Sequence, residues 1–304
     1  MIARFDELRT SPKKARTPQR KTRDLWDAIS AVASEYRRLS VRQLYYQLVA
    51  RGVIEKTEMA YKRVCDASAQ MRLDGALPYR KIADGHRTRR AVFAHDGLND
   101  ALASAHQLYR RNYWIDQPWQ VEVWCEKDAL TGVIQPVCDV YGVPYVATRG
   151  FPSITLRYES AQALIETGKP AIIFYFGDHD ASGRAISDNL EAELRHHGAT
   201  VTVERVALNP EQIETWSLPT RPGKASDSRQ AGFAQRFGGA SVELDALPPN
   251  ALTDLVETAI EGRIDQRSWD RVEQIEDLER ATLASLVEIA WQPGQSYHIE
   301  GAAS

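Results

Sequence analysis

Asp178 and Asp180 are separated by one residue and directly follow the apolar run of residues 171–176. Two carboxylates at alternate positions of an extended segment point the same way, and they repel each other when both are charged. A hard divalent cation with oxygen ligands relieves this repulsion, so the pair is a candidate magnesium site. The alternative is a solvated acidic turn in which Ser182 caps the next helix.

The elements around this pair place it at the edge of a sheet. Residues 171–176 are rich in β-branched and aromatic side chains, which predicts a strand buried on both faces and paired in parallel. Helical spacing of apolar residues begins at about Ser182. Ligands bind where such a strand gives way to a helix, so this position favours the metal interpretation.

Strands and helices alternate through the middle of the chain. We expect strands over residues 119–125, 144–148, 171–176 and 201–207. Helical patterns lie between them, which predicts an α/β domain with a parallel sheet and right-handed crossovers. Glu126 follows the first strand and is expected at the same edge as Asp178 and Asp180, with Lys127 beside it.

Length and composition limit the class of protein. The chain has 304 residues, for which two domains are expected, and its 43% apolar and 26% charged content are typical of a soluble globular protein. No apolar run suits a membrane span, and the polar, basic N-terminus predicts no signal peptide. The isolated Cys65, Cys125 and Cys138 predict neither disulfides nor a zinc ribbon. We therefore expect a cytoplasmic protein, nucleoid-associated if the source is prokaryotic, without a membrane partner.

The net charge of −3 conceals a strong asymmetry. Residues 1–111 carry 23 Lys and Arg against 12 Asp and Glu, a net +11, whereas residues 112–304 carry 15 against 29, a net −14. A basic first third beside an acidic remainder predicts a polyanion-binding module joined to a metal-binding one.

The basic part begins with an arm, residues 1–23, which either follows a phosphate backbone or is a solvated tail. A winged-helix-like DNA-binding domain is expected over residues 24–112. Its helices are predicted at 24–38, at 41–51 after a Ser40 cap, at 58–73 after a Thr57 cap, and at 98–113 as a connection. The third helix and the wing after it supply the candidate DNA contacts, Lys62, Arg63, Arg72, Arg80, Lys81 and Arg87.

The second of these helices carries two consecutive tyrosines, Tyr45 and Tyr46. Successive helical positions point about 100° apart, so we expect one ring to share the apolar face and the other to present its hydroxyl elsewhere. A phenol beside an arginine and a metal-bound phosphate can attack phosphorus. The alternative is that both tyrosines are ordinary amphipathic aromatics.

Together these features resemble a known family. Glu126 at one strand end and Asp178-x-Asp180 at a later one resemble the Toprim domain of topoisomerases, primases and related nucleases. The Arg42-Gln-Leu-Tyr-Tyr46 helix upstream resembles the A subunit of topoisomerase VI and its meiotic double-strand-break relative. The resemblance covers about residues 25–207. The chain is shorter than a typical A subunit, so it is similar to the reduced, stand-alone forms of mobile elements.

The resemblance implies an activity and its residues. Tyr46 would be the nucleophile that joins the 5′ end of DNA, with Arg42 and Lys127 helping to neutralise the phosphate. Glu126, Asp178 and Asp180 would hold Mg²⁺, for which Mn²⁺ can substitute. Two chains would form a homodimer, each tyrosine working with its partner's metal site. The chain has no Walker-type phosphate loop, so strand passage would need an ATPase partner.

Two alternatives remain open. The first is a Toprim nuclease that hydrolyses DNA with metal-activated water and uses Tyr46 only structurally. The second is a non-catalytic DNA-binding protein whose carboxylates have lost their function.

The last part of the chain is less informative. The Toprim-like domain is expected to span residues 113–247, and its loop at 218–229 could touch DNA or the metal site. Glu243 and Asp245 lie on one face of a strand-like run, where a solvated surface is favoured over extra metal ligands. Amphipathic helices are predicted at 252–264 and 269–290, within the C-terminal region 248–304, covering the sheet or forming a dimer contact.

Overall fold

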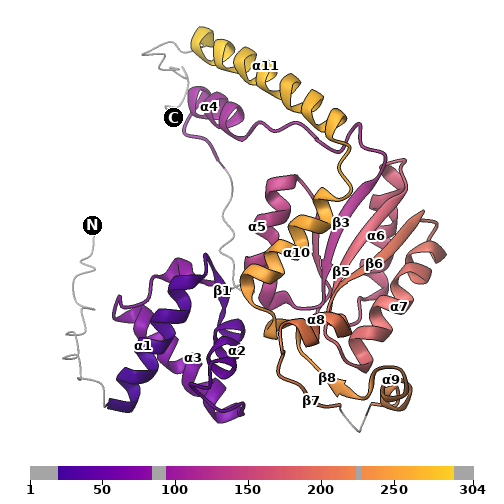
Figure 1. Ribbon diagram of the computed structural model, residues 1–304. Helices are drawn as coiled ribbons and strands as arrows, with labels where there is room; N and C mark the ends of the chain where they lie inside the picture. Colours follow the sequence, from indigo (N-terminus) through magenta and orange to yellow (C-terminus); the bar gives the residue numbers. More distant parts are fainter. Residues whose placement is uncertain (1–19, 84–93, 224–226, 291–304) are drawn as a thin grey trace, which may run out of the picture. The chain divides into compact units, whose positions relative to one another are not determined.

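The computed structural model of the chain describes residues 20–83, 94–223 and 227–290 (Figure 1). The chain forms two compact units, residues 1–82 and 83–304. The boundary differs from the expected one near residue 112, because helix α4 (Leu98–Leu108) packs against α11 (Gln266–Ala290) in the second unit. Of the expected basic arm, residues 1–19 lie outside the described part, and the remainder begins the first helix.

The first unit is helical. Its elements are α1 (Arg20–Glu35), β1 (Leu39–Ser40), α2 (Val41–Ala50), α3 (Glu58–Leu73), η1 (Tyr79–Lys81) and β2 (Ile82–Ala83), with β1 and β2 paired. The predicted caps are confirmed, because the Ser40 and Thr57 side chains accept hydrogen bonds from the backbone nitrogens of Gln43 and Ala60. Each of the three α-helices packs on the other two, around a core that includes Ile29, Leu44, Leu48, Val64 and Met71.

The second unit contains a parallel four-stranded sheet, which confirms the predicted α/β arrangement. Its strands are β3 (Gln120–Cys125), β4 (Tyr145–Ala147), β5 (Ala171–Phe176) and β6 (Val201–Ala207), in the order β4-β3-β5-β6. Cys125 pairs in register with Phe176, so the residues that follow them, Glu126 and Gly177, lie together at the carboxyl edge.

Helices cover both faces of this sheet, in three layers (Figure 1). Helices α6 (Ile154–Glu166) and α7 (Ala181–His196) pack on one face, where Ile173 and Tyr175 join their core, while α5 (Thr131–Tyr141) and α10 (Pro249–Glu261) lie on the other. All six residues of β5 are buried, as its unbroken apolar sequence predicts.

Short elements complete the second unit. They are η2 (Asp128–Leu130), α8 (Pro210–Thr215), β7 (Arg221–Pro222), α9 (Gln230–Phe237), β8 (Ala240–Ser241) and η3 (Leu244–Ala246). The segment after β8 returns to the sheet edge, because Val242 forms an antiparallel bridge with His179. This bridge brings residues 243–246 beside the predicted metal ligands.

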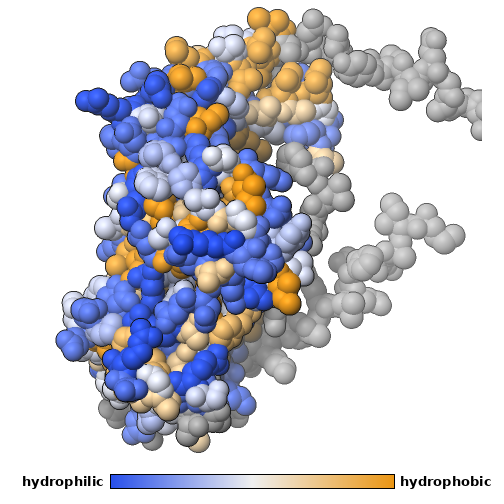
Figure 2. Space-filling model, turned by 90° about the vertical axis from the view of Figure 1, so that its right-hand side faces the viewer, coloured by the Kyte–Doolittle hydropathy of each residue, from blue (hydrophilic) through white to orange (hydrophobic). Residues whose placement is uncertain are grey.

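The pair α4 and α11 exposes apolar side chains, including Leu108, Leu278 and Ile289, and apolar surface gathers at this end of the unit in Figure 2. No helix in the described ranges combines the length and apolar character needed to cross a membrane.

Candidate functional site

Glu126 lies in a cradle formed by two glycines at the carboxyl edge of the sheet. Its Oε2 accepts a hydrogen bond from the backbone nitrogen of Asp178 at 3.0 Å. A Cβ atom added at Gly177 would lie 3.0 Å from Oε2, and one added at Gly183 would lie 2.9 Å from it and 2.3 Å from the Asp178 carbonyl oxygen. At Gly177 the added Cβ would also lie 2.5 Å from a ring carbon of Tyr175, so a side chain at either position would displace Tyr175 or the Asp178 backbone.

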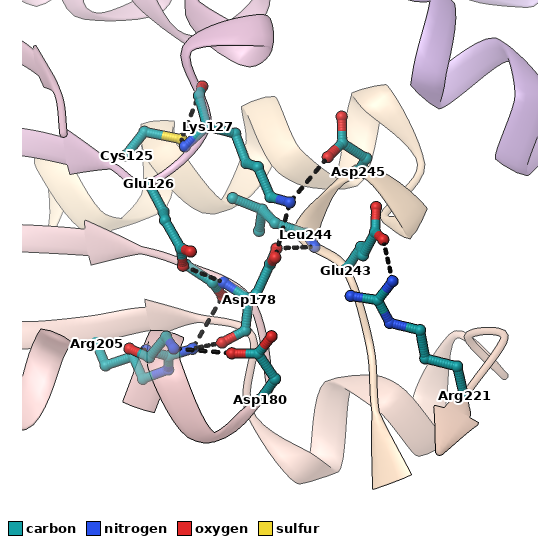
Figure 3. A network of polar contacts seen from close by, with 12 residues as sticks. Cys125, Glu126, Lys127, Asp178, Asp180, Arg205, Arg221, Glu243, Leu244 and Asp245 are labelled. Atoms are coloured by element: carbon teal, nitrogen blue, oxygen red, sulfur yellow. Dashed lines mark hydrogen bonds and ion pairs between the residues drawn. The ribbon is translucent and has the colours of Figure 1, made fainter. Parts of the chain in front are cut away.

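Asp178 is held through both of its oxygens and is 5% exposed (Figure 3). Oδ1 accepts a hydrogen bond from the backbone nitrogen of Leu244 at 2.8 Å, and Oδ2 lies 2.7 Å from the Lys127 ammonium nitrogen. The first contact comes from the segment after β8 and the second from the residue after Glu126. Asp178 therefore joins three parts of the chain that are distant in sequence.

Asp180 is the N-cap of α7, because its Oδ1 accepts a hydrogen bond from the backbone nitrogen of Gly183 at 2.8 Å. The alternative assignment of this cap to Ser182 is wrong. Ser182 stands inside the first turn, and its hydroxyl donates to Oδ2 of Asp227 at 2.9 Å. Capping fixes the Asp180 carboxylate at a helix N-terminus, where negative charge is favoured.

Arg205 of β6 fixes the backbone beneath these carboxylates. Each of its five N–H groups meets one acceptor at 2.5–3.2 Å: the carbonyl oxygens of Gly177, Asp178, Gly183 and Leu208, and the hydroxyl oxygen of Ser187. None of these acceptors is a carboxylate. The guanidinium therefore acts as a template that sets the path of the chain from the end of β5 into α7.

Glu243 and Asp245 belong to the site, contrary to the expectation of a solvated strand face. Asp245 is 0% exposed, and its Oδ2 lies 3.7 Å from the Lys127 ammonium nitrogen. Glu243 is buried and forms an ion pair of 2.7 Å with Arg221 of β7 (Figure 3). The physical reason is the bridge between His179 and Val242, which turns this segment inward.

Burial and crowding of like charges change the acidity of these groups. Burial, followed by the charge of Asp178, raises the pKa of Glu126 to about 7. Burial also raises the pKa of Asp178 and outweighs the opposing effect of Lys127. Burial alone would lower the pKa of Lys127, but Asp178 and Asp245 raise it above its usual value. The lysine is therefore a permanent positive charge, whereas Glu126 changes charge near neutral pH.

The donor chemistry of this edge fits a hard divalent cation. Within the described ranges, no three acidic, histidine or cysteine side chains are arranged to hold a metal ion. The Lys127 ammonium instead stands as a positive charge at Asp178. Beside Glu126, the Tyr175 hydroxyl is buried and finds no hydrogen-bond partner in the described part of the chain. Glu126, Asp178 and Asp180 therefore supply the oxygen donors that Mg²⁺ prefers, but in the described ranges they do not form a group of three converging ligands.

In the first unit, both tyrosines of α2 are buried, so the expectation that only one of the two rings would share the apolar face is wrong. Tyr45 is 5% and Tyr46 3% exposed, because α1 and α3 both pack on α2 and leave it little free surface. The Tyr46 ring lies against that of Tyr45, with the Lys56 ammonium 5.5 Å from its centre. Arg42 stacks on the Tyr61 ring, 4.8 Å from its centre.

The predicted DNA contacts fall into three groups. Lys62, Arg63 and Arg80 are exposed. Two others are half-buried with internal partners: Arg72 donates to the Ser68 carbonyl oxygen at 3.1 Å, and Lys81 donates to that of Tyr36 at 2.7 Å. Arg87 and most of the expected wing lie outside the described residues.

Sequence reasoning brought Glu126, Lys127, Asp178 and Asp180 to one edge, and the structure places them together there. Nothing in the sequence indicated a role for Arg205, because an arginine in a predicted strand cannot be told from an ordinary surface residue by sequence alone. Gly177 and Gly183 flank the Asp-x-Asp motif, and that placement was the one available signal for the cradle.

Comparison with known proteins gives no further assignment, because no family model matches the chain and no curated protein is significantly similar to it.

Proposed function

We propose that the chain is a magnesium-dependent enzyme that cleaves DNA by tyrosine transesterification, as the A subunit of topoisomerase VI does. One observation carries the proposal: Glu126, Asp178 and Asp180 share the carboxyl edge of a parallel sheet, each held by a backbone N–H group. Such preorganised carboxylates suit a cation that must hold a phosphodiester in one geometry.

In the proposed step, the Tyr46 hydroxyl oxygen attacks the phosphorus and forms a phosphotyrosyl bond to the 5′ end. The bond between phosphorus and the 3′ oxygen breaks, the phenol proton passes to solvent, and the leaving oxygen takes up a proton as a 3′-hydroxyl. A bound Mg²⁺ would orient the phosphate and offset its developing charge. Arg42 and Lys127 would neutralise the remaining phosphate charge. The reaction requires the Tyr46 ring to leave its buried position.

The burial of Tyr46 favours a second candidate, a Toprim-type nuclease that hydrolyses DNA with water. A side chain that is 3% exposed and packed on Tyr45 has the environment of a core residue. In that case Tyr46 supports α2, and the same carboxylates serve to activate water.

One experiment separates these functions. Supercoiled plasmid is incubated with the protein and Mg²⁺ or Mn²⁺, denatured with detergent, and run on a gel with and without protease. Transesterification leaves protein covalently attached to cut DNA, hydrolysis leaves free ends, and a non-catalytic DNA-binding protein leaves the plasmid intact. Tyr46→Phe abolishes cleavage in the first case and preserves it in the second. Asp178→Ala and Glu126→Ala abolish cleavage in both, without weakening DNA binding.

We also propose a homodimer with composite sites, since Tyr46 belongs to the first unit and the carboxylates to the second. Twofold symmetry matches the two strands of duplex DNA. Mixing Tyr46→Phe chains with Asp178→Ala chains restores one competent site per heterodimer and yields nicks. Heterodimers that form yet stay inactive would show that each site lies within one chain. Relaxation of the plasmid beyond cleavage would additionally need an ATPase partner.

A further inference from the structure

Lys127 stands against the carboxylate to which the proposed function assigns a metal. Its ammonium nitrogen lies 2.7 Å from Oδ2 of Asp178 and 3.7 Å from Oδ2 of Asp245 (Figure 3). The Lys127 side chain is 24% exposed, whereas those of Asp178 and Asp245 are 8% and 1% exposed. The lysine thus reaches from the more accessible side of the site toward two carboxylates buried behind it.

The two oxygens of Asp178 are not equivalent. Oδ1 is directed to the backbone nitrogen of Leu244 at 2.8 Å, which fixes the orientation of the carboxylate. Oδ2 carries the ion pair with Lys127. A divalent cation coordinated through Oδ2 would come within a few ångströms of the ammonium group, and two cations at that distance repel strongly in a partly buried site. A metal ion at Oδ2 and the lysine would therefore compete for the same oxygen.

Asp245 offers the lysine a second position. It belongs to η3, directly after Leu244, so the backbone that orients Asp178 also places Asp245. A movement of about 1 Å would bring the ammonium group from its present distance to a close ion pair with Asp245. The lysine has the four-carbon stem and rotatable head that such a movement needs.

We propose that Lys127 is a tethered counter-ion with two positions, on Asp178 when the site is free of metal and on Asp245 when a divalent cation binds Asp178. Asp245 is then a positioning residue that acts through Lys127 and makes room for the metal. The inference rests on the proposed assignment of a cation to Asp178. It gives a role to Asp245, a buried carboxylate whose Oδ2 lies 3.7 Å from the Lys127 ammonium nitrogen.

The test is a double-mutant cycle read by calorimetric titration of Mn²⁺ into the full chain without DNA. Lys127→Met removes the competing charge and is expected to tighten Mn²⁺ binding about tenfold. Asp245→Asn removes the second position and is expected to weaken binding about tenfold. In the Lys127→Met background, Asp245→Asn should have little further effect on Mn²⁺ affinity, since no lysine is then present for Asp245 to bind. An equal effect of Asp245→Asn in both backgrounds would overturn the proposal, because Asp245 would then act only as a distant negative charge.

A matched control uses the exposed ion pair between Arg236 and Asp188, 3.4 Å apart in the same unit. Arg236→Met and Asp188→Asn change the net charge in the same way and should leave Mn²⁺ affinity within about twofold. If Lys127→Met does not fold, ¹⁵N-lysine NMR of the wild type reports the same event. The Lys127 ammonium signal should shift on addition of diamagnetic Mg²⁺, and an unmoved signal at saturation contradicts the proposal. Wild type that binds neither ion overturns the proposed metal site itself, whereas binding with an additive cycle overturns only the role of Lys127 and Asp245.

Discussion

Oε2 of Glu126 accepts the backbone N–H of Asp178 at 3.0 Å, so one proposed metal ligand fixes the chain that presents the next. The contact joins the ends of two neighbouring parallel strands, β3 and β5. It makes Glu126 a structural residue as well as a candidate ligand, and changes around its carboxylate should therefore affect both stability and metal binding.

Gly183→Ala should disrupt this contact, because the added Cβ would lie 2.3 Å from the Asp178 carbonyl oxygen and 2.9 Å from Glu126 Oε2. We expect a loss of about 2 kcal/mol in the free energy of unfolding and weaker Mn²⁺ binding. The control is Gly232→Ala in α9, where an added Cβ meets nothing within 4 Å. That change should stabilise the protein by up to about 1 kcal/mol. Equal stability of the two variants in urea titrations would contradict the cradle.

The raised pKa of Glu126, about 7, predicts a pH dependence of the metal-free protein. The unfolded chain loses this proton near its ordinary pKa of 4.5, whereas the folded chain keeps it up to about 7. Between these values the folded state binds more protons, so the stability contributed by Glu126 is present at low pH and is lost as the pH rises through 7. Relative to Glu126→Gln, the wild type should lose roughly 2 kcal/mol of unfolding free energy between pH 5 and pH 8 in chelator. If the difference in unfolding free energy between the wild type and Glu126→Gln stays constant with pH, the raised pKa of Glu126 is contradicted.

Arg205→Met should remove a donor from five buried acceptors, of which the Gly177 and Leu208 carbonyl oxygens keep a second one, and cost roughly 3 kcal/mol of unfolding free energy. Arg205→Lys retains at most three donors and should recover part of that loss. Mn²⁺ affinity should fall in the same order, because the Asp178 and Gly183 backbone is no longer held. Stability that falls while Mn²⁺ affinity stays unchanged would limit Arg205 to a purely structural role.

The exposed basic residues of α3 predict a salt-dependent interaction with DNA. Lys62→Ala combined with Arg63→Ala should weaken binding to duplex DNA and lower the slope of log affinity against log salt by about 2. Arg37 and Arg38, which lie between α1 and α2 and are also exposed, form the matched control pair. Fluorescence anisotropy at several salt concentrations measures both slopes, and an equal reduction in the two double variants would argue against α3 as the contact helix.

Local signals made part of this structure predictable. Residues 171–176 form β5 as predicted, because an apolar run bounded by proline and glycine suits only a buried strand in this context. The Ser40 and Thr57 caps were likewise predictable, since a cap depends on the next three residues. The alternative interpretation placed the cap at Ser182 rather than Asp180, because both residue types cap helices and the sequence does not show which of the two positions begins the helix.

Contacts between distant segments were not predictable in the same way. Asp245 is buried because Val242 pairs with His179, more than sixty residues earlier, and no local pattern encodes that pairing. The five acceptors of Arg205 are mostly backbone carbonyls, which carry no sequence signal. Tyr45 and Tyr46 are both buried because α1 and α3 pack on α2 from two sides, whereas the spacing of apolar residues in α2 predicted a single buried face.

The pairing of α4 with α11 predicts an order of unfolding within the second unit. These helices stand before and after the whole sheet in sequence, yet they pack together, and Arg111, three residues after α4, contacts Glu276 and Glu279 of α11. No residue of α4 is buried, so little apolar surface offsets the entropy of closing so long a loop. The α4–α11 pair should therefore separate while the sheet stays folded. Amide hydrogens of α4 should then exchange with solvent well before those of β3 and β5. Helices α4 and α11 are thus expected to unfold locally while the carboxyl edge of the sheet, which holds Glu126, Asp178 and Asp180, stays folded.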